Sequence, residues 1–178
     1  MIENKKYEEK YENRIYETLE ECIKCTMDIC ASVAIEGVSS GKGGPFGAAI
    51  VQKVDNVYKI ISIAQNTVVK DNNPTSHAEM NAIKKASEIL GSFELKNCIL
   101  ITTAKSCPMC LATSCWARIS EIYYGVGYEY ASKYGFIDSD ILEYLQGKNS
   151  IIKEINLDSD VAKKPFEEWA NKEDRVNY

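Results

Sequence analysis

His77-Ala78-Glu79, followed about thirty residues later by Cys107-Pro108-Met109-Cys110, is the stretch around which the rest of this chain is organised. It contains the only histidine of the sequence and a Cys-x-x-Cys pair. One imidazole and two thiolates supply three ligands for a tetrahedral zinc ion, and catalytic zinc sites leave the fourth position to water. Because a glutamate follows the histidine by two residues, the pattern predicts a zinc-activated water with its own proton shuttle.

Each half of this pattern has a simpler explanation when it is taken alone. A histidine at the start of an apolar helix is more often a capping or core residue, and an isolated Cys-x-x-Cys can be a redox pair or part of a structural zinc site. Cys98 or Cys115 could supply a fourth ligand and close the site, but neither lies at a repeated ligand spacing. The two halves in this order, with a helix and a strand between them, favour catalytic zinc.

Composition narrows the classes of protein. The chain has 178 residues, 45% of them hydrophobic, and a net charge of −5. The length suggests one domain with a sizeable core. The negative charge argues against a dominant electrostatic grip on nucleic acid. The start of the chain lacks the apolar core of a signal peptide, and no apolar run is long enough to span a membrane.

The cysteine content points to a reducing compartment. Seven cysteines are present, which is an odd number, and their spacings form no paired framework. We therefore expect reduced thiols in a cytoplasmic protein, two of them on zinc. The expected organisation is a polar N-terminal arm over residues 1–14, a zinc-binding domain over 15–157 and a C-terminal tail over 158–178.

Hydrophobic periodicity predicts the elements of the first half of the domain. Apolar residues recur at three- and four-residue steps from Ile15 to Ala34, as on one face of an amphipathic helix that ends before Gly37. The stretches 46–51 and 57–64 are apolar or β-branched and have a turn between them. We therefore expect an antiparallel hairpin.

The zinc motif lies at the start of two predicted helices. Thr75 or Ser76 can cap the first of them, which holds His77 and Glu79 in its first turn and ends at Gly91. The positive end of such a helix stabilises negative charge nearby.

A buried strand over 98–103 is expected to deliver Cys107 to the start of the second helix. A strand over 119–126 follows, and the helix between these two strands implies a parallel pair. Residues 131–147 are expected to be helical in part, 151–157 to form a last strand, and the tail to contain a short helix.

These motifs together resemble the cytidine deaminase superfamily, and within it most closely the bacterial guanine deaminases and related purine deaminases. The resemblance runs from about residue 16 to the C terminus. The residues that carry it are Gly43-Gly44-Pro45-Phe46-Gly47-Ala48, Asn66, Asn73-Pro74-Thr75-Ser76-His77-Ala78-Glu79, Cys107-Pro108-Met109-Cys110, Trp116-Ala117-Arg118 and Gly135-Phe136. The zinc motif is specific to the superfamily, whereas the other stretches favour guanine deaminase less specifically.

The resemblance implies an α/β protein with a three-layer α/β/α fold around a five-stranded mixed sheet, assembled as a homodimer. It implies that His77, Cys107 and Cys110 hold Zn²⁺. It also implies that Glu79 takes a proton from the attacking water, passes it to a ring nitrogen and then helps ammonia to leave.

The resemblance also assigns the substrate contacts. Asn66 would hydrogen-bond the ring or carbonyl edge of the base, and backbone groups around Phe46 and Ala48 would hold the base itself. Phe46 or Trp116 could stack on the base, although an aromatic in such a place is as often plain core. The tail, which ends at Tyr178, is expected to act as a lid over the active site of its own subunit or, with exchanged tails, of the partner's.

Two positions depart from the pattern of the family. The residue before the first zinc cysteine is usually proline, preceded by glutamate, but this chain has Ser106 and Lys105 there. Guanine deaminases that resemble this chain usually carry an aspartate at position 130, which helps to recognise guanine. Tyr130 cannot supply that carboxylate, and it becomes a candidate substrate contact of another kind.

The function expected from the sequence is zinc-dependent hydrolytic deamination of a free purine base or related heterocycle, foremost guanine to xanthine and ammonia. The alternative enzymes are cytosine deaminase and tRNA adenosine deaminase. The latter needs a positively charged surface that binds phosphates. The tail from Asp158 onward has six acidic residues against four basic ones, and this negative balance argues against RNA binding. A non-catalytic zinc-stabilised binding module is the alternative of another class. Glu79 argues against it, because zinc binding does not require that carboxylate.

Overall fold

The computed structural model describes residues 10–176, which form two compact units that divide between Asp138 and Ser139. The first unit contains β1 (Ile15–Tyr16), α2 (Leu19–Ser39), β2 (Gly47–Val54), β3 (Val57–Gln65), α3 (Val68–Asp71), α4 (Ala78–Leu90), β4 (Cys98–Ala104), α5 (Pro108–Trp116), β5 (Glu121–Val126) and α6 (Tyr128–Ser132). The second unit contains α7 (Ser139–Leu145), the 3-10 helix η1 (Asp160–Lys163) and α8 (Lys164–Asn171). None of the described helices is long and apolar enough to cross a membrane.

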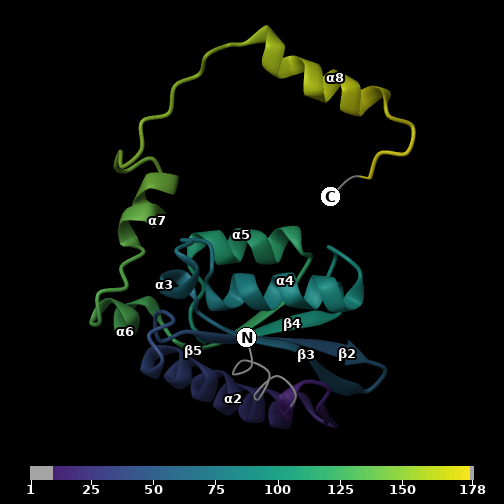
Figure 1. The fold of residues 1–178 in the computed structure, drawn as a ribbon, viewed down its shortest axis with the longest axis vertical. Helices are drawn as coiled ribbons and strands as arrows, with labels where there is room; N and C mark the ends of the chain where they lie inside the picture. Colours follow the sequence, from purple (N-terminus) through teal and green to yellow (C-terminus); the bar gives the residue numbers. More distant parts are fainter. Residues whose placement is uncertain (1–9, 177–178) are drawn as a thin grey trace. The chain divides into compact units, whose positions relative to one another are not determined.

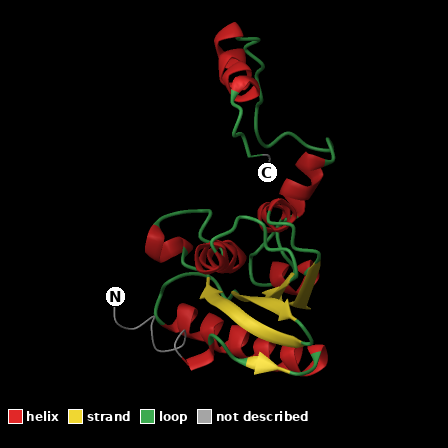
Figure 2. Ribbon diagram, turned by 90° about the vertical axis from the view of Figure 1, so that its right-hand side faces the viewer, coloured by secondary structure: helices red, strands yellow, loops and turns green. Residues whose placement is uncertain are grey.

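The first unit is built on one mixed sheet with the strand order β1-β3-β2-β4-β5 (Figures 1 and 2). All neighbours are antiparallel except β4 and β5, which are parallel. The helix α2 covers one face of the sheet, and α4 and α5 lie on the other (Figure 1). The expected three-layer α/β/α fold with a five-stranded mixed sheet is therefore confirmed.

The central strand β2 is apolar throughout its first half because both of its faces are covered. Ala48 and Ile50 belong to the core on the α4 side, whereas Ala49 and Val51 belong to the core on the α2 side. This alternation follows the two-residue period of a strand. The strand begins at a glycine because α2 packs closely against it: a Cβ atom at Gly47 would lie 2.0 Å from the carbonyl oxygen of Cys30.

The N-terminal helix starts and ends later than the periodicity predicted. Ile15 belongs to the short strand β1, where it pairs with Lys59 of β3. The helix begins only after Thr18, whose side chain accepts a hydrogen bond from the backbone N–H of Glu21 at 3.2 Å. It continues past Gly37, which is buried, as far as Ser39. Both predicted ends were therefore wrong. The cap at Thr18 decides where the helix starts, and the close packing of Gly37 lets the helix continue past this glycine.

The predicted strand over residues 151–157 was also wrong. These residues belong to the second unit and form no regular strand. The fifth strand of the sheet is β1, which lies at the opposite end of the chain. The short helix expected in the tail is confirmed as α8. Its Phe166 side chain is 77% exposed.

Candidate active site

The histidine of the zinc motif is held at the N-terminus of α4. The side chain of Asn73 accepts hydrogen bonds from the backbone N–H and the hydroxyl of Thr75, at 3.0 and 2.9 Å. His77 follows this turn as the N-cap of the helix, in an extended conformation. The expected cap at Thr75 or Ser76 was therefore wrong, because the helix begins one residue later at Ala78. Glu79 lies in the first turn and is only 5% exposed.

The two cysteines are positioned by the N-terminus of α5 in the same way. Cys107 is the N-cap residue, and Pro108 occupies the start of the helix, where its missing N–H leaves no bond unmade. Cys110 then lies in the first turn and is fully buried. The loop before Cys107 is held by Tyr128, whose hydroxyl donates to the carbonyl oxygen of Ser106 at 2.7 Å. Two helix N-termini therefore meet at the motif, and both favour negative charge there.

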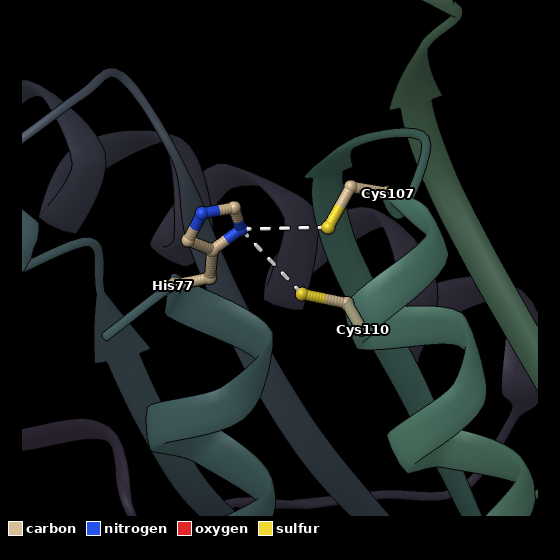
Figure 3. Close-up of side chains that lie close together, drawn as sticks. All are labelled: His77, Cys107 and Cys110. Carbon is tan, nitrogen blue, oxygen red and sulfur yellow. Dashed lines mark hydrogen bonds between the residues drawn. The ribbon is translucent and has the colours of Figure 1, made fainter. Parts of the chain in front are cut away.

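The three ligand atoms have the spacing of a tetrahedral zinc site. The Nδ1 atom of His77 lies 3.6 Å from the Sγ atoms of both Cys107 and Cys110 (Figure 3). All three atoms lie within 4.8 Å of one another. Bonds of about 2.0–2.1 Å to nitrogen and about 2.3 Å to sulfur, at a tetrahedral angle, separate such ligands by about 3.6 Å. These residues therefore fit zinc.

No fourth protein ligand joins this cluster within residues 10–176. His77, Cys107 and Cys110 form the single group of histidine, cysteine and acidic residues in that range that could hold a metal ion. Cys98 is 1% exposed and belongs to the hydrophobic core on the α4 side of the sheet. Cys115 is exposed in the last turn of α5. A zinc ion with three protein ligands keeps an open position, as catalytic zinc sites do.

Burial and neighbouring groups shift the pKa values of three side chains in the site, Cys107, Cys110 and Glu79. The hydrogen bond from Cys110, followed by that from His77, lowers the pKa of the Cys107 thiol to about 4. The same hydrogen bond raises the pKa of the Cys110 thiol, so one negative charge is shared by the pair and rests on Cys107. Burial raises the pKa of the Glu79 carboxyl above its usual range. Such a shift brings a carboxylate closer to the pH at which it can both accept and donate a proton.

A cavity of about 370 Å³ opens beside the metal ligands. This volume lies within the range of small-molecule sites, which are mostly apolar with a few well-placed polar groups. Five polar side chains of its wall come from four places in the chain: Asn66, His77 with Glu79, Lys105, and Asp138. Its apolar wall includes Phe46 and Phe136, whose rings meet edge to face with centroids 4.7 Å apart.

Asn66 is held in one orientation by the glycine-rich loop. Its Oδ1 atom accepts hydrogen bonds from the backbone N–H groups of Gly44 and Val68, at 3.2 and 3.1 Å. Its amide NH₂ group therefore remains to donate into the cavity. A Cβ atom at Gly43 would lie 2.1 Å from the same Oδ1 atom, which explains why glycine is needed there. The Gly-Gly-Pro-Phe-Gly stretch thus shapes the site through its backbone.

The remaining candidate substrate contacts lie in different places. Ala48 is fully buried in β2, so its side chain belongs to the core beneath the site. Trp116 is 60% exposed at the C-terminal end of α5, and it is absent from the wall of the zinc cavity. Tyr130 lines an apolar cavity along α2, which shares Phe46 and Phe136 with the zinc cavity. Tyr178 lies outside the described residues.

Sequence reasoning missed one polar residue of the cavity wall, Asp138. It follows the left-handed turn at Gly135 by three residues, in the same loop as Phe136. The resemblance already contained Gly135-Phe136, and that was the signal that could have drawn attention to the acidic residue just after it. Lys105, which stands where the family usually has glutamate, also lines the cavity. Its ammonium lies 4.7 Å from the centroid of the Tyr128 ring.

Comparison with known proteins identifies several relatives. Residues 20–126 match the family described as the cytidine and deoxycytidylate deaminase zinc-binding region. The guanine deaminase of Bacillus subtilis (strain 168) is 38% identical over 151 residues, covering 83% of this chain and 93% of that protein. A crystal structure of guanine deaminase from Bacillus subtilis superposes with a TM-score of 0.80 at 36% identity, covering 87% of this chain and 98% of the other. A tRNA-specific adenosine deaminase of Rickettsia bellii is 35% identical over 104 residues, covering 58% of this chain and 68% of that protein.

Proposed function

The chain belongs to the cytidine and deoxycytidylate deaminase family and is a zinc-dependent hydrolytic deaminase, and from this premise we propose that it converts guanine to xanthine and ammonia. The observation that carries the proposal is one cavity that contains three zinc ligands with an open coordination position, a buried glutamate and an oriented asparagine amide. The likeness to guanine deaminase over most of both chains favours guanine among the possible bases.

The chemistry divides between the metal and Glu79. His77, Cys107 and Cys110 would hold the zinc ion, and when bound it would make a water nucleophilic at neutral pH. Glu79 accepts a proton as the water attacks the carbon that bears the amino group, and it gives this proton to the neighbouring ring nitrogen. The same carboxylate then moves the second proton to the amino group, which leaves as ammonia. One water is consumed and one ammonia is released.

Other groups of the cavity are proposed to hold the base. The NH₂ group of Asn66 donates to an acceptor on the ring or carbonyl edge, and the ring of Phe46 packs on the face of the base. The backbone of the strand at Ala48 supports the base from below. The support for these roles is that Asn66 and Phe46 line the same cavity as Glu79.

The proposal is tested by measuring ammonia release from a panel of amino-substituted heterocycles. We expect guanine to give the highest kcat/KM, with xanthine as the second product, ahead of guanosine, adenine, cytosine, pterins and aminated triazines. A tRNA anticodon stem-loop is included because tRNA-specific adenosine deaminases are among the relatives. Preferred turnover of that RNA, or of cytosine, would replace guanine as the substrate. Zinc-loaded protein that deaminates none of them would support a binding module instead.

We also propose that the enzyme is a cytoplasmic homodimer and that the tail closes the active site. The support is the family resemblance of the tail and, for the compartment, the seven cysteines, whose spacings form no paired framework. Light scattering on purified protein measures the number of subunits, and a mass of about one chain would contradict the dimer.

Deletion of residues 172–178 tests the role of the tail as a lid. The deletion begins directly after α8 ends at Asn171, so it removes no residue of a described helix. We expect unchanged zinc content and nearly unchanged melting, with a higher KM or a lower kcat, because an open site admits water and holds the base less tightly. Equal turnover by the truncated and the full-length protein would mean that the tail is only a packing element.

A further inference from the structure

Ser106 lies in the loop that joins β4 to α5, directly before the zinc ligand Cys107. The residue is only 5% exposed. Within residues 10–176 its hydroxyl oxygen is buried and completes no hydrogen bond. Buried polar groups are almost always hydrogen-bonded in folded proteins, so this exception calls for an explanation. A proline, which the family usually has at this position, would leave no such hydroxyl.

The group next to this hydroxyl is the carboxyl of Glu79. Burial raises the pKa of that carboxyl, and the Ser106 hydroxyl acts in the opposite direction because it stabilises the ionised form. An ionised carboxylate only accepts hydrogen bonds, whereas a serine hydroxyl can donate one. Hydrogen bonds of a catalytic site are often loose before the substrate binds and tighten in the complex. The two groups are therefore complementary neighbours whose bond is not yet completed.

The backbone around Ser106 is anchored on both sides. The backbone N–H of Lys105 donates to the carbonyl oxygen of Val126 at 2.8 Å. The hydroxyl of Tyr128 donates to the carbonyl oxygen of Ser106 at 2.7 Å. Cys107 then caps α5. A donor on a backbone held in this way loses little conformational entropy when its hydrogen bond forms.

Ser106 can act on the base only through the carboxylate. Glu79 and Cys107 are in the contact range of the zinc cavity or its ligands, whereas Ser106 is not part of the cavity wall. The Glu79 carboxylate has to reach the attacking water first and the ring nitrogen and amino group afterwards, so its direction matters at each step. A hydrogen bond to one carboxylate oxygen leaves the other oxygen free to carry the proton.

We propose that Ser106 is a positioning residue whose hydroxyl donates a hydrogen bond to the Glu79 carboxylate and orients it for proton transfer. This inference rests on the proposed function, because it requires Glu79 to be the proton shuttle. It does not depend on which base is the substrate. It also gives a role to the serine that replaces the usual proline before the first zinc cysteine.

The first test is the effect of Ser106→Ala on the best substrate of the ammonia-release panel. We expect kcat to fall by about 10-fold or more, in keeping with the loss of a hydrogen bond to a charged group, and KM to change by less than about twofold. Ser106→Thr keeps the hydroxyl and should recover most of the loss. In a Glu79→Gln background, Ser106→Ala should alter kcat by less than about threefold, because an amide that carries no proton gains nothing from being oriented.

Thermal melting gives a second readout, on which a structural role and a positioning role predict different results. Removal of a buried hydroxyl that has no partner should leave the melting temperature of the zinc-loaded protein unchanged or raise it. The matched control is Ser62→Ala in β3. The Ser62 hydroxyl is also buried, but it donates to the carbonyl oxygen of Ala82 at 2.8 Å. Its removal should lower the melting temperature and change kcat by less than about twofold.

A crystal structure of the zinc-loaded protein with a substrate analogue tests the contact directly. It should place the Oγ atom of Ser106 within about 2.5–3.0 Å of a carboxylate oxygen of Glu79. A longer separation in that complex, with the two groups bonded to other partners, would contradict the inference.

The kinetic outcomes separate this inference from the function on which it rests. If Glu79→Gln is nearly inactive but Ser106→Ala keeps the wild-type kcat, the proposed function stands and the inference is wrong. The inference is also wrong if Ser106→Ala lowers kcat by the same factor with and without Glu79→Gln, because the hydroxyl then does not act through Glu79. If the wild type deaminates no member of the panel, or if Glu79→Gln turns over normally, the proposed mechanism and this inference both fall.

Discussion

Replacement of Glu79 by glutamine is expected to lower the turnover of guanine by at least about a hundredfold, the low end of the range for general acid–base catalysis. The amide has nearly the same shape as the carboxylate, but it cannot accept a proton from water and return it to the substrate. Because Glu79 is not among the three metal ligands, the variant should still bind one zinc ion per chain. The loss should therefore appear in kcat, with KM for the base changed little.

A matched control is available on the same helix. Glu88 is also in α4, but it is exposed, so Glu88→Gln makes the same chemical change far from the cavity. Zinc content by atomic emission and single-turnover kinetics distinguish a lost proton shuttle from a lost metal. Near-normal turnover in zinc-loaded Glu79→Gln would rule out the role assigned to this carboxylate.

The zinc site could be predicted from the sequence because metal chemistry restricts both residue type and spacing. A helix N-terminus can present a cap residue and one residue of its first turn to the same point, and the chain does this twice. His77 and Glu79 lie at the start of α4, and Cys107 and Cys110 lie at the start of α5. The parallel pair of β4 and β5 followed from the helix between them. These features depend on short stretches of sequence.

Features that depend on distant contacts were predicted less well. Ile15 continues the apolar periodicity of α2, yet it pairs with Lys59 of β3 instead. The β-branched residues of 151–157 were predicted to form a strand, but a strand needs an edge on which to pair. The sheet of the first unit ends at β1 on one side and β5 on the other. Local propensity does not reveal which segment reaches an edge.

The wall of the cavity was the least predictable part of the site. The loop after α6 turns through Gly135, whose φ of +87° lies in the left-handed region that glycine adopts readily. This turn places Asp138 in the wall of the zinc cavity and Phe136 between that cavity and the apolar cavity along α2, which Tyr130 lines. The direction of a loop side chain depends on such a turn, and the spacing of residues in the sequence does not determine it.

Substitution of either zinc cysteine is expected to remove the metal and a large part of the stability together. Metal binding to the folded chain stabilises it by RT ln(1 + [L]/Kd), which is about 4 kcal/mol when free zinc exceeds Kd a thousandfold. For a chain of this size, 1 kcal/mol shifts the melting temperature by roughly 2–4 °C. Cys107→Ala and Cys110→Ala should therefore melt on the order of 10 °C below the zinc-loaded wild type. Both should lose deaminase activity.

The control for these variants is another cysteine of the same helix. Cys115 is exposed at the far end of α5, so Cys115→Ala changes one thiol without touching the site and should keep zinc, melting temperature and activity. Wild-type protein stripped with a chelator separates the metal from the side chain. Its melting temperature should be close to that of the two zinc-site variants, because all three proteins lack the free energy of zinc binding. Zinc retained at one ion per chain in a Cys107→Ala, Cys110→Ala double variant would contradict the assigned site, because a single histidine cannot hold the ion alone.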